Sequence, residues 1–218
     1  MHAEVMLPDF RRSLVNPVCV IISFIGLFVF AASAAVADDS KASEKAEAAQ
    51  VVIESLHDAL VATAADSSLS FDERYEKLAP VVTESHDFDF ISRFVLRRSW
   101  SKLEPAQREK FIDTFQRLSI TNYASRFANI KERSLAVTGV RGTSGKRLQV
   151  DALLQTAELN VNLSYTLKAL DESWAIINVV ADGVSDLALR RAEYSQVLKK
   201  QGFDGLIRRL DGQIADLQ

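Results

Sequence analysis

Two histidines and three aspartates are the side chains best suited to chemistry beyond the first 37 residues of the chain. They are His57, His86, Asp87, Asp89 and Asp182. A metal site would need both histidines together with carboxylates, and their spacing is not that of metal ligands. The aspartates could be catalytic carboxylates, but aspartate is equally common in helix caps and turns. We therefore expect no metal and no other cofactor, and we assign no catalytic residue.

The sequence motifs of common enzyme classes do not occur in this chain. It has no G-x-S-x-G nucleophile elbow, no phosphate-binding loop and no dinucleotide fingerprint. The single cysteine, Cys19, lies in an apolar run near the N-terminus, so the rest of the chain has neither a thiol nucleophile nor a disulfide. A Ser-His-Asp arrangement assembled in space stays open. A net charge of −3 does not favour nucleic acid as a partner.

The first 37 residues have the order of a secretory signal peptide. Arg11 and Arg12 form a basic start, residues 18–32 form an apolar run, and residues 35–37 (Ala-Val-Ala) offer the small side chains of a cleavage site. The apolar run is shorter than the roughly 20 residues of a membrane-spanning helix. We therefore predict export to a periplasm after cleavage, by the general or the twin-arginine route, with a membrane anchor as the alternative.

The first half of the remaining chain is predicted to be helical. No glycine occurs between Gly26 and Gly139, and the segment is rich in Ala, Glu, Lys, Leu and Phe. Residues 38–45 are small and polar and are expected to be flexible, and residues 46–218 are expected to form a single domain. The last helix of this half starts at Ser101 or Glu104 with Pro105 in its first turn. The predicted helices cover residues 46–64, 70–82, 88–96 and 104–130.

The second half alternates apolar and polar residues with period two, which is typical of strands. Gly142 and Gly145 bound a predicted hairpin loop. Gly202 separates two closing helices, at residues 186–199 and 203–214. The predicted strands cover residues 135–140, 147–154, 160–168 and 174–180. The fold class is α+β: a helical N-terminal half packs on a curved four-stranded antiparallel sheet, followed by two C-terminal helices.

The apolar residues allow two interpretations. The chain holds 12 phenylalanines, and nearly all of those after residue 37 lie in the helical half, opposite a sheet whose inner positions are Leu, Val and Tyr. These residues could form an ordinary packed core or line an apolar cavity, and spacing alone does not separate the two. In residues 88–100, FDFISRFVLRRSW, the aromatic rings are expected to point inward, and Arg93, Arg97 and Arg98 outward.

Several short motifs occur in a set order along the chain. They comprise Phe88, Asp89, Phe90, Leu96, Trp100, Gln107, Arg108, Phe111, Phe115, Tyr123, Ala124, Trp174, Gly183, Val184, Ser185, Arg190 and residues 202–207. In the order and spacing of these positions the chain resembles the MlaC family, the toluene-tolerance-type periplasmic lipid carriers. The resemblance extends from about residue 45 to residue 214. Arg97 replaces a common glycine of the family, Asn178 replaces an aspartate, and Leu189 and Tyr194 replace a Tyr and a Phe. The segments 123–127 and 182–191 are similar to the hopanoid-biosynthesis-associated branch.

The resemblance implies a lipid-binding domain with an apolar pocket between helices and sheet. It implies a shuttle that carries a phospholipid or hopanoid between complexes in the inner and outer membranes. Arg93, Arg97 and Arg98 are either a solvated helix face or contacts to a head group or acidic partner. A module without ligand and, less favoured, an enzyme on a lipid or isoprenoid remain alternatives. The expected pocket residues are Phe94, Phe115, Tyr123, Phe127, Leu148, Val150, Leu163, Tyr165, Leu167 and Ile176.

Overall fold

The chain forms five α-helices, one 3₁₀ helix and five strands within the residues that the structure describes. A computed structural model describes residues 32–127, 134–143, 146–156, 159–171 and 173–218. Most of the predicted signal peptide, residues 1–31, lies outside the described residues, so it stays a prediction. None of the described helices has both the length and the apolar content needed to cross a bilayer.

The first helix, α1 (Ala32–Ala65), starts earlier than the predicted residue 46. Residues 38–45 are helical, because they continue a run of good helix formers such as Ala, Lys and Glu. Whether they are flexible stays a prediction. The second half of the helix buries Ile53, Leu56 and Leu60. Their three- and four-residue spacing gives α1 one apolar face.

Helix α2 (Phe71–Ser85) begins with a complete capping box, in which the Ser70 and Glu73 side chains bond each other's backbone N–H groups. The helix carries Pro80 on its exposed side and buries Leu78 and Val82. This match to the predicted helix 70–82 follows from the cap, which is readable in the sequence.

Three helical segments follow without a long loop. Helix α3 (Phe88–Leu96) is capped by the Asp87 carboxylate, and the 3₁₀ helix η1 (Arg97–Lys102) continues from it. Helix α4 (Pro105–Arg126) has proline in its first turn, as predicted. It ends at Arg126, earlier than the predicted residue 130.

The sheet is open and antiparallel, with strands in chain order. Four of its strands were predicted, and a two-residue fifth strand adds to them. This fifth strand pairs with the end of the fourth strand, and the tight turn Asp182-Gly183 connects the two. Both turn residues have positive φ. The strands are β1 (Ser134–Gly142), β2 (Arg147–Gln155), β3 (Asn160–Ala169), β4 (Trp174–Ala181) and β5 (Val184–Ser185).

A β-bulge interrupts the pairing of β3 with β4. Leu167 pairs with Ile176 and Thr166 pairs with Asn178, so Ile177 is the extra residue. A bulge bends its strand and changes which face its side chains point to. Up to and including this extra residue, β4 is buried on both faces, from Trp174 to Ile177.

The closing helical segment, α5 (Asp186–Leu217), is divided at Gly202, whose φ of 69° is not helical. The two predicted closing helices are therefore present, with the break at the predicted residue. Ser185 caps the first of them by accepting from the Ala188 N–H.

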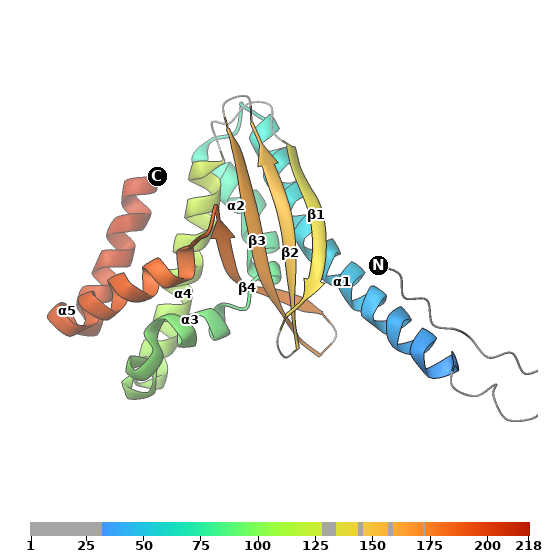
Figure 1. Cartoon of the computed structure of the whole chain (residues 1–218). Helices are drawn as coiled ribbons and strands as arrows, with labels where there is room; N and C mark the ends of the chain where they lie inside the picture. The colour runs from blue at the N-terminus through green and yellow to red at the C-terminus, as the bar shows by residue number, and fades with distance from the viewer. Residues whose placement is uncertain (1–31, 128–133, 144–145, 157–158, 172) are drawn as a thin grey trace, which may run out of the picture. The chain divides into compact units, whose positions relative to one another are not determined.

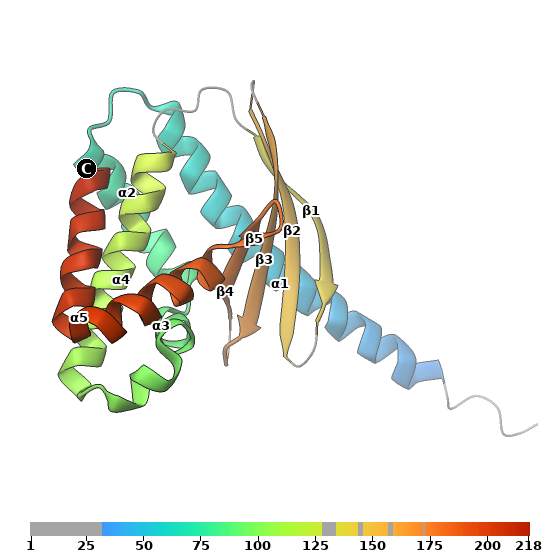
Figure 2. The same cartoon turned by 60° about the vertical axis from the view of Figure 1, so that its left-hand side comes forward.

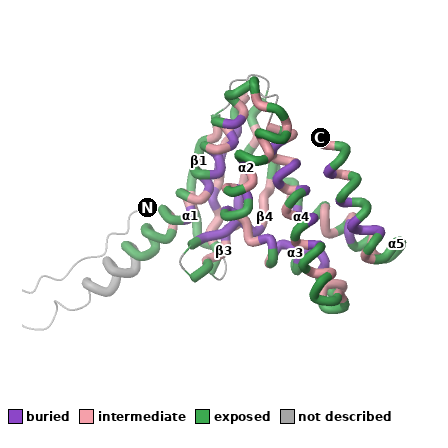
Figure 3. Tube along the Cα trace, turned by 180° about the vertical axis from the view of Figure 1, so that it is seen from behind, coloured by how far each residue is buried: buried purple, intermediate pink, exposed green. Residues whose placement is uncertain are grey.

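The helices cover one face of the sheet. Figure 2 shows the sheet nearly edge-on, with α2, α3, α4 and α5 on one side of it. In Figure 1 the strands run side by side from β1 to β4, and α4 lies behind α5. Buried positions gather where helices and strands face each other, whereas α1 is exposed over residues 40–45 (Figure 3). These layers confirm the predicted α+β fold.

Candidate ligand-binding cavity

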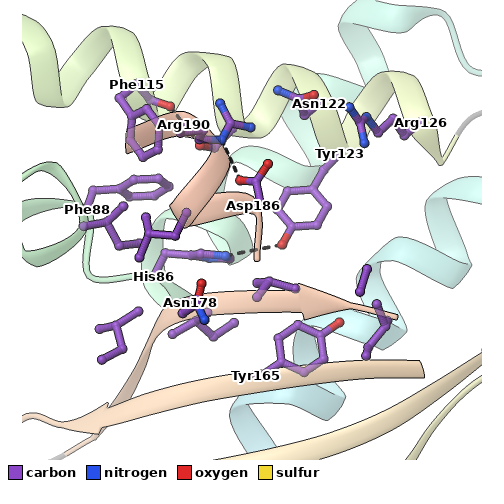
Figure 4. Close-up of a pocket in the computed structure, with 18 of the residues that line it drawn as sticks. His86, Phe88, Phe115, Asn122, Tyr123, Arg126, Tyr165, Asn178, Asp186 and Arg190 are labelled. Carbon is purple, nitrogen blue, oxygen red and sulfur yellow. Dashed lines mark hydrogen bonds and ion pairs between the residues drawn. The ribbon is translucent and has the colours of Figure 1, made fainter. Parts of the chain in front are cut away.

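A cavity of about 260 Å³ lies between the helical layer and the inner face of β3 and β4. Figure 4 shows α4 on one side of it, the two strands on the other, and the first turn of α5 at its edge. Most of its wall is aromatic or aliphatic. The lining residues are His86, Phe88, Ile91, Phe115, Ser119, Asn122, Tyr123, Arg126, Phe127, Leu163, Tyr165, Ile176, Ile177, Asn178, Val179, Ala181, Val184, Asp186, Leu187 and Arg190.

Aromatic rings pack against one another along the helical wall of the cavity. The Phe88 ring meets Phe115 edge-on at 6.1 Å between centroids, and it stacks on His86 at 5.5 Å. The wall continues with Tyr123, about two turns beyond Phe115 on α4, and with Phe127 at the C-cap of that helix. Such edge-to-face contacts fix ring orientation, so this side of the cavity is a preformed apolar surface.

His86 and Tyr123 form a polar pair inside this wall. The Tyr123 hydroxyl lies 3.3 Å from His86 Nε2, and the Val82 carbonyl lies 3.0 Å from Nδ1. A carbonyl only accepts, so Nδ1 carries the ring hydrogen and Nε2 is free to accept the tyrosine hydroxyl. Burial lowers the pKa of His86 to about 4, against the opposing effect of the Val82 hydrogen bond. The imidazole is therefore neutral at neutral pH.

A second histidine–tyrosine pair closes the cavity from the other side. His57 on α1 lies 2.9 Å from the Tyr165 hydroxyl of β3, and both residues are buried. Burial lowers the pKa of His57 to about 4, although Asp58 and Glu54 oppose the shift. Burial also raises the pKa of Tyr165. Both tyrosine hydroxyls are thus satisfied by neutral partners, so their rings present apolar surface to the cavity at little desolvation cost.

The polar edge of the cavity is built from the start of α5. Arg190 forms an ion pair with Asp186 at 2.5 Å, and its guanidinium lies 5.4 Å from the centre of the Phe115 ring. The Tyr194 hydroxyl accepts a further hydrogen bond from Arg190 at 3.2 Å. Asp186 and Val184 are exposed. The cavity therefore meets solvent here, and a ligand could place a polar end at this edge.

Asn178 joins this edge to the sheet. Its side-chain oxygen accepts a hydrogen bond from the Ser185 hydroxyl at 2.9 Å. It lines the cavity because the bulge at Ile177 shifts the facing of β4 by one residue. An aspartate here would add a negative charge to the cavity wall, and asparagine keeps that wall neutral.

The three aspartates singled out in the sequence have structural contacts. Asp87 caps α3 and bonds Lys168 at 2.6 Å, and Asp89 forms an ion pair with Arg93. Asp182 accepts from the Asn162 backbone N–H beside the β4–β5 turn. Within the described residues, no three His, Cys, Asp or Glu side chains are grouped so that they could hold a metal ion.

Six of the ten predicted pocket residues line the cavity. They are Phe115, Tyr123, Phe127, Leu163, Tyr165 and Ile176.

The other four predicted residues do not line this cavity, and a role for them in lipid binding stays a prediction. Val150 and Leu167 are fully buried in the packed core, and Leu148 packs against that core. Phe94 is 40% exposed on the outer side of α3. Alternation identified the inner face of the sheet correctly, but the cavity occupies only the part of that face under α4.

Seven lining residues have polar side chains that the pattern of apolar positions did not indicate. Arg190 and Asp186 look like ordinary charged positions of a surface helix. Serine is a common N-cap residue, so Ser185 indicates in the sequence that a helix starts at Asp186. It does not indicate that the first turn of this helix lies at the edge of a cavity. The polar lining residues that were not predicted for the pocket are His86, Ser119, Asn122, Arg126, Asn178, Asp186 and Arg190.

The three arginines of residues 88–100 lie outside the cavity. Arg93, Arg97 and Arg98 are all exposed, which agrees with a solvated helix face. Arg93 forms an ion pair with Asp89 at 2.9 Å, and Arg97 adopts a positive φ of 46° at the end of α3.

The protein is an α+β protein with an open antiparallel sheet and helices over one face of that sheet. An apolar cavity connected to solvent lies between the two layers, as in proteins that bind apolar ligands. Comparison with known sequences makes this class specific. The model of the MlaC protein family matches residues 50–212, so the chain belongs to the MlaC family. The resemblance found in the sequence is thereby confirmed.

Two relatives illustrate the relation. The toluene tolerance protein ttg2D of Pseudomonas putida is 26% identical over 144 residues, which span 65% of this chain and 65% of that protein. The structure of a phospholipid-binding protein from Ralstonia solanacearum, solved in complex with a phospholipid, superposes with a TM-score of 0.69. It is 21% identical and covers 78% of this chain and 98% of its own, and it shares the fold.

Proposed function

We propose that this protein is a periplasmic phospholipid-binding carrier and not an enzyme. The observation that carries the proposal is an apolar cavity whose two tyrosine hydroxyls are satisfied by neutral histidines and which has a polar, solvent-connected edge at Asn178, Asp186 and Arg190. The family match and the phospholipid in the related structure support this choice of ligand. A lipid would bury its acyl part between the layers and leave its head group at the Asp186–Arg190 edge.

The energetics explain why such a carrier is needed. Each CH₂ group left in water costs about 0.8 kcal/mol, so a sixteen-carbon chain costs on the order of 12 kcal/mol. A cavity of about 150 Å³ holds one benzene molecule. The cavity of about 260 Å³ is therefore too small for a complete diacyl lipid. Loading requires the helical layer and the sheet to move apart, or part of the chains to extend through the open edge.

The carrier would move its lipid between complexes in the inner and outer membranes. One fixed affinity cannot serve both loading and release, so each complex must favour a different state of the carrier. The family match supports this cycle as a proposal, and its direction would be set by the partner complexes. A hopanoid cargo is the variant of the proposal that the resemblance of residues 182–191 suggested.

The test is to export the full chain to a bacterial periplasm, purify it without detergent, and analyse it by native mass spectrometry and solvent extraction. A bound phospholipid mass, recovered chemically intact, is the expected result. A bound hopanoid mass would show that the cargo is a hopanoid and not a phospholipid. A ligand-free protein that stays so after incubation with both lipids would overturn the carrier and favour a module without ligand. A chemically altered lipid would favour the enzyme.

A matched pair of variants links binding to the cavity. Ser119→Trp places an indole in the cavity wall, whereas Ser195→Trp makes the same change on the exposed side of α5. We expect Ser119→Trp to lose most of the co-purified lipid and Ser195→Trp to keep it. Equal lipid content in the two variants would place the lipid somewhere else.

A further inference from the structure

The outer side of α3 carries two phenylalanines surrounded by arginines. The Phe90 and Phe94 rings stack at 6.4 Å between centroids. The Arg191 guanidinium of α5 lies 5.3 Å from the Phe94 centroid, and the Arg147 guanidinium of β2 lies 5.7 Å from that of Phe90. Three elements far apart in sequence thus converge on one aromatic pair. We call these four residues, together with the exposed Arg97 and Arg98 that directly follow α3 in the chain, the α3 patch.

The α3 patch has an excess of positive charge. Nearby, Arg93 is paired with Asp89 and Lys168 with Asp87, so these two cations are neutralised. Among the described residues, the four arginines of the patch form no ion pair with a carboxylate. The chain as a whole has a net charge of −3, so this concentration of unpaired cations is local and runs against the overall charge.

The α3 patch combines this charge with exposed apolar surface. Phe94 is 40% exposed, and Arg147 and Arg191 lie over the rings of Phe90 and Phe94, where cation–π contacts hold these two guanidinium groups beside the aromatic pair. Guanidinium groups bind phosphate with two parallel hydrogen bonds. Exposed aromatic rings favour the boundary between head groups and acyl chains. An anionic phospholipid surface satisfies both features together, whereas an acidic protein surface would satisfy the charge alone.

The α3 patch is continuous with the cavity wall. Phe88 and Ile91 line the cavity from the inner side of α3, and Phe90 and Phe94 lie on its outer side. On α5, Arg190 lines the cavity and its neighbour Arg191 belongs to the patch. Figure 1 shows α3 beside the first part of α5, away from the C-terminus. Any contact at the patch therefore acts on two helices that shape the cavity.

From these observations we propose that the α3 patch docks the protein directly on an anionic phospholipid bilayer. The patch would hold the carrier at the membrane surface with α3 and the start of α5 facing the head groups. This inference adds a membrane contact to the proposed carrier function and does not depend on which lipid the cavity holds.

The test is co-sedimentation of the full chain with phosphatidylcholine vesicles that do or do not contain phosphatidylglycerol. We expect binding to the anionic vesicles, at least about tenfold weaker binding to neutral ones, and loss of binding at raised salt. Arg98→Glu combined with Arg147→Glu should weaken binding at least about tenfold, because each cation near an anionic surface contributes to affinity. Phe94→Ser should weaken it by a smaller factor.

Two controls make the result specific. Lys77→Glu combined with Arg208→Glu makes the same change in charge at exposed positions of α2 and the second half of α5, and should leave binding unchanged. Ser119→Trp should keep vesicle binding while losing cavity lipid, which separates docking from cargo uptake. Equal binding to neutral vesicles, or no effect of the arginine reversals, would overturn the proposal. Binding to polyglutamate without binding to anionic vesicles would overturn it too, in favour of an acidic protein partner.

Discussion

Lys168 on β3 and Asp87 at the start of α3 are joined by an ion pair of 2.6 Å, which ties the helical layer to the sheet beside the cavity. The Asp87 backbone N–H also donates to the Ile176 carbonyl of β4 at 3.0 Å. The second carboxylate oxygen of Asp87 accepts from the Phe90 N–H and caps α3. One residue therefore fixes where α3 begins and how it meets two strands.

We predict that Asp87→Ala destabilises the protein more than Lys168→Met does. Asp87→Ala removes a helix cap worth about 1 kcal/mol and leaves the half-buried Lys168 ammonium without its partner, so a total of about 2–4 kcal/mol is expected. Lys168→Met leaves the cap in place and should cost about 1 kcal/mol. Urea denaturation of both variants measures the difference. An equal loss would contradict the double role of Asp87.

The buried His57 and the half-buried His86 predict a loss of stability between pH 6.5 and pH 4. Burial lowers the pKa of both His57 and His86 from 6.5 to about 4. The unfolded chain therefore binds protons at a higher pH than the folded one, and folding becomes less favourable as the pH falls through this window. Below pH 4 the loss would reach on the order of 3 kcal/mol per histidine.

Denaturation at several pH values, with NMR titration of the imidazoles, tests this prediction. Replacing His57 by Gln keeps a hydrogen-bonding group near the Tyr165 hydroxyl but removes the titration. The variant should lose less stability than the parent protein between pH 6.5 and pH 4. If either imidazole titrates near pH 6.5 in the folded protein, that histidine is solvated and does not destabilise the fold at low pH.

The sequence predicted the layers well because they follow from local chemistry. The Ser70–Glu73 capping box, Pro105 in a first turn and the period-two alternation of β3 are all readable without a structure. The inward position of Tyr165 followed from that alternation. Gly202 was predicted to end a helix, and it does so with a φ of 69°.

The limits of the cavity could not be predicted in the same way. Leu163 and Leu167 have the same facing on β3, yet Leu163 lines the cavity and Leu167 is packed in the core. The difference depends on which helix lies above each residue, and the alternation of a strand does not contain that information. The bulge at Ile177 likewise turns Asn178 toward the cavity. The sequence directly around Ile177 has no glycine that would have indicated this bulge.

The break in α5 gives a prediction about backbone strain. Gly202 has a φ of 69° and a ψ of −170°, a conformation that only glycine adopts easily, whereas Gly212 lies in regular helix. A Cβ at either position would meet no neighbour within 4 Å, so the two changes differ in backbone conformation alone. Gly202→Ala should cost about 1–3 kcal/mol, and Gly212→Ala should stabilise by up to about 1 kcal/mol. Thermal unfolding with opposite shifts would support this assignment.

Arg97 provides the last prediction, because it adopts a conformation that favours glycine. Its φ of 46° and ψ of −119° lie in a region that a side chain rarely enters, and its backbone N–H bonds the Arg93 carbonyl to end α3. It also forms no ion pair with a described carboxylate. Arg97→Gly should therefore relieve strain without removing an ion pair, and raise the free energy of unfolding by about 1 kcal/mol.

Arg98→Gly is the matched control for that change. Arg98 lies in the 3₁₀ helix η1 and has no positive φ, so glycine there should only add freedom to the unfolded chain and lower stability. Urea denaturation should thus place the Arg97→Gly variant above the parent protein and the Arg98→Gly variant below it. If both variants fall below the parent, the Arg97 side chain contributes more to stability than its backbone conformation costs.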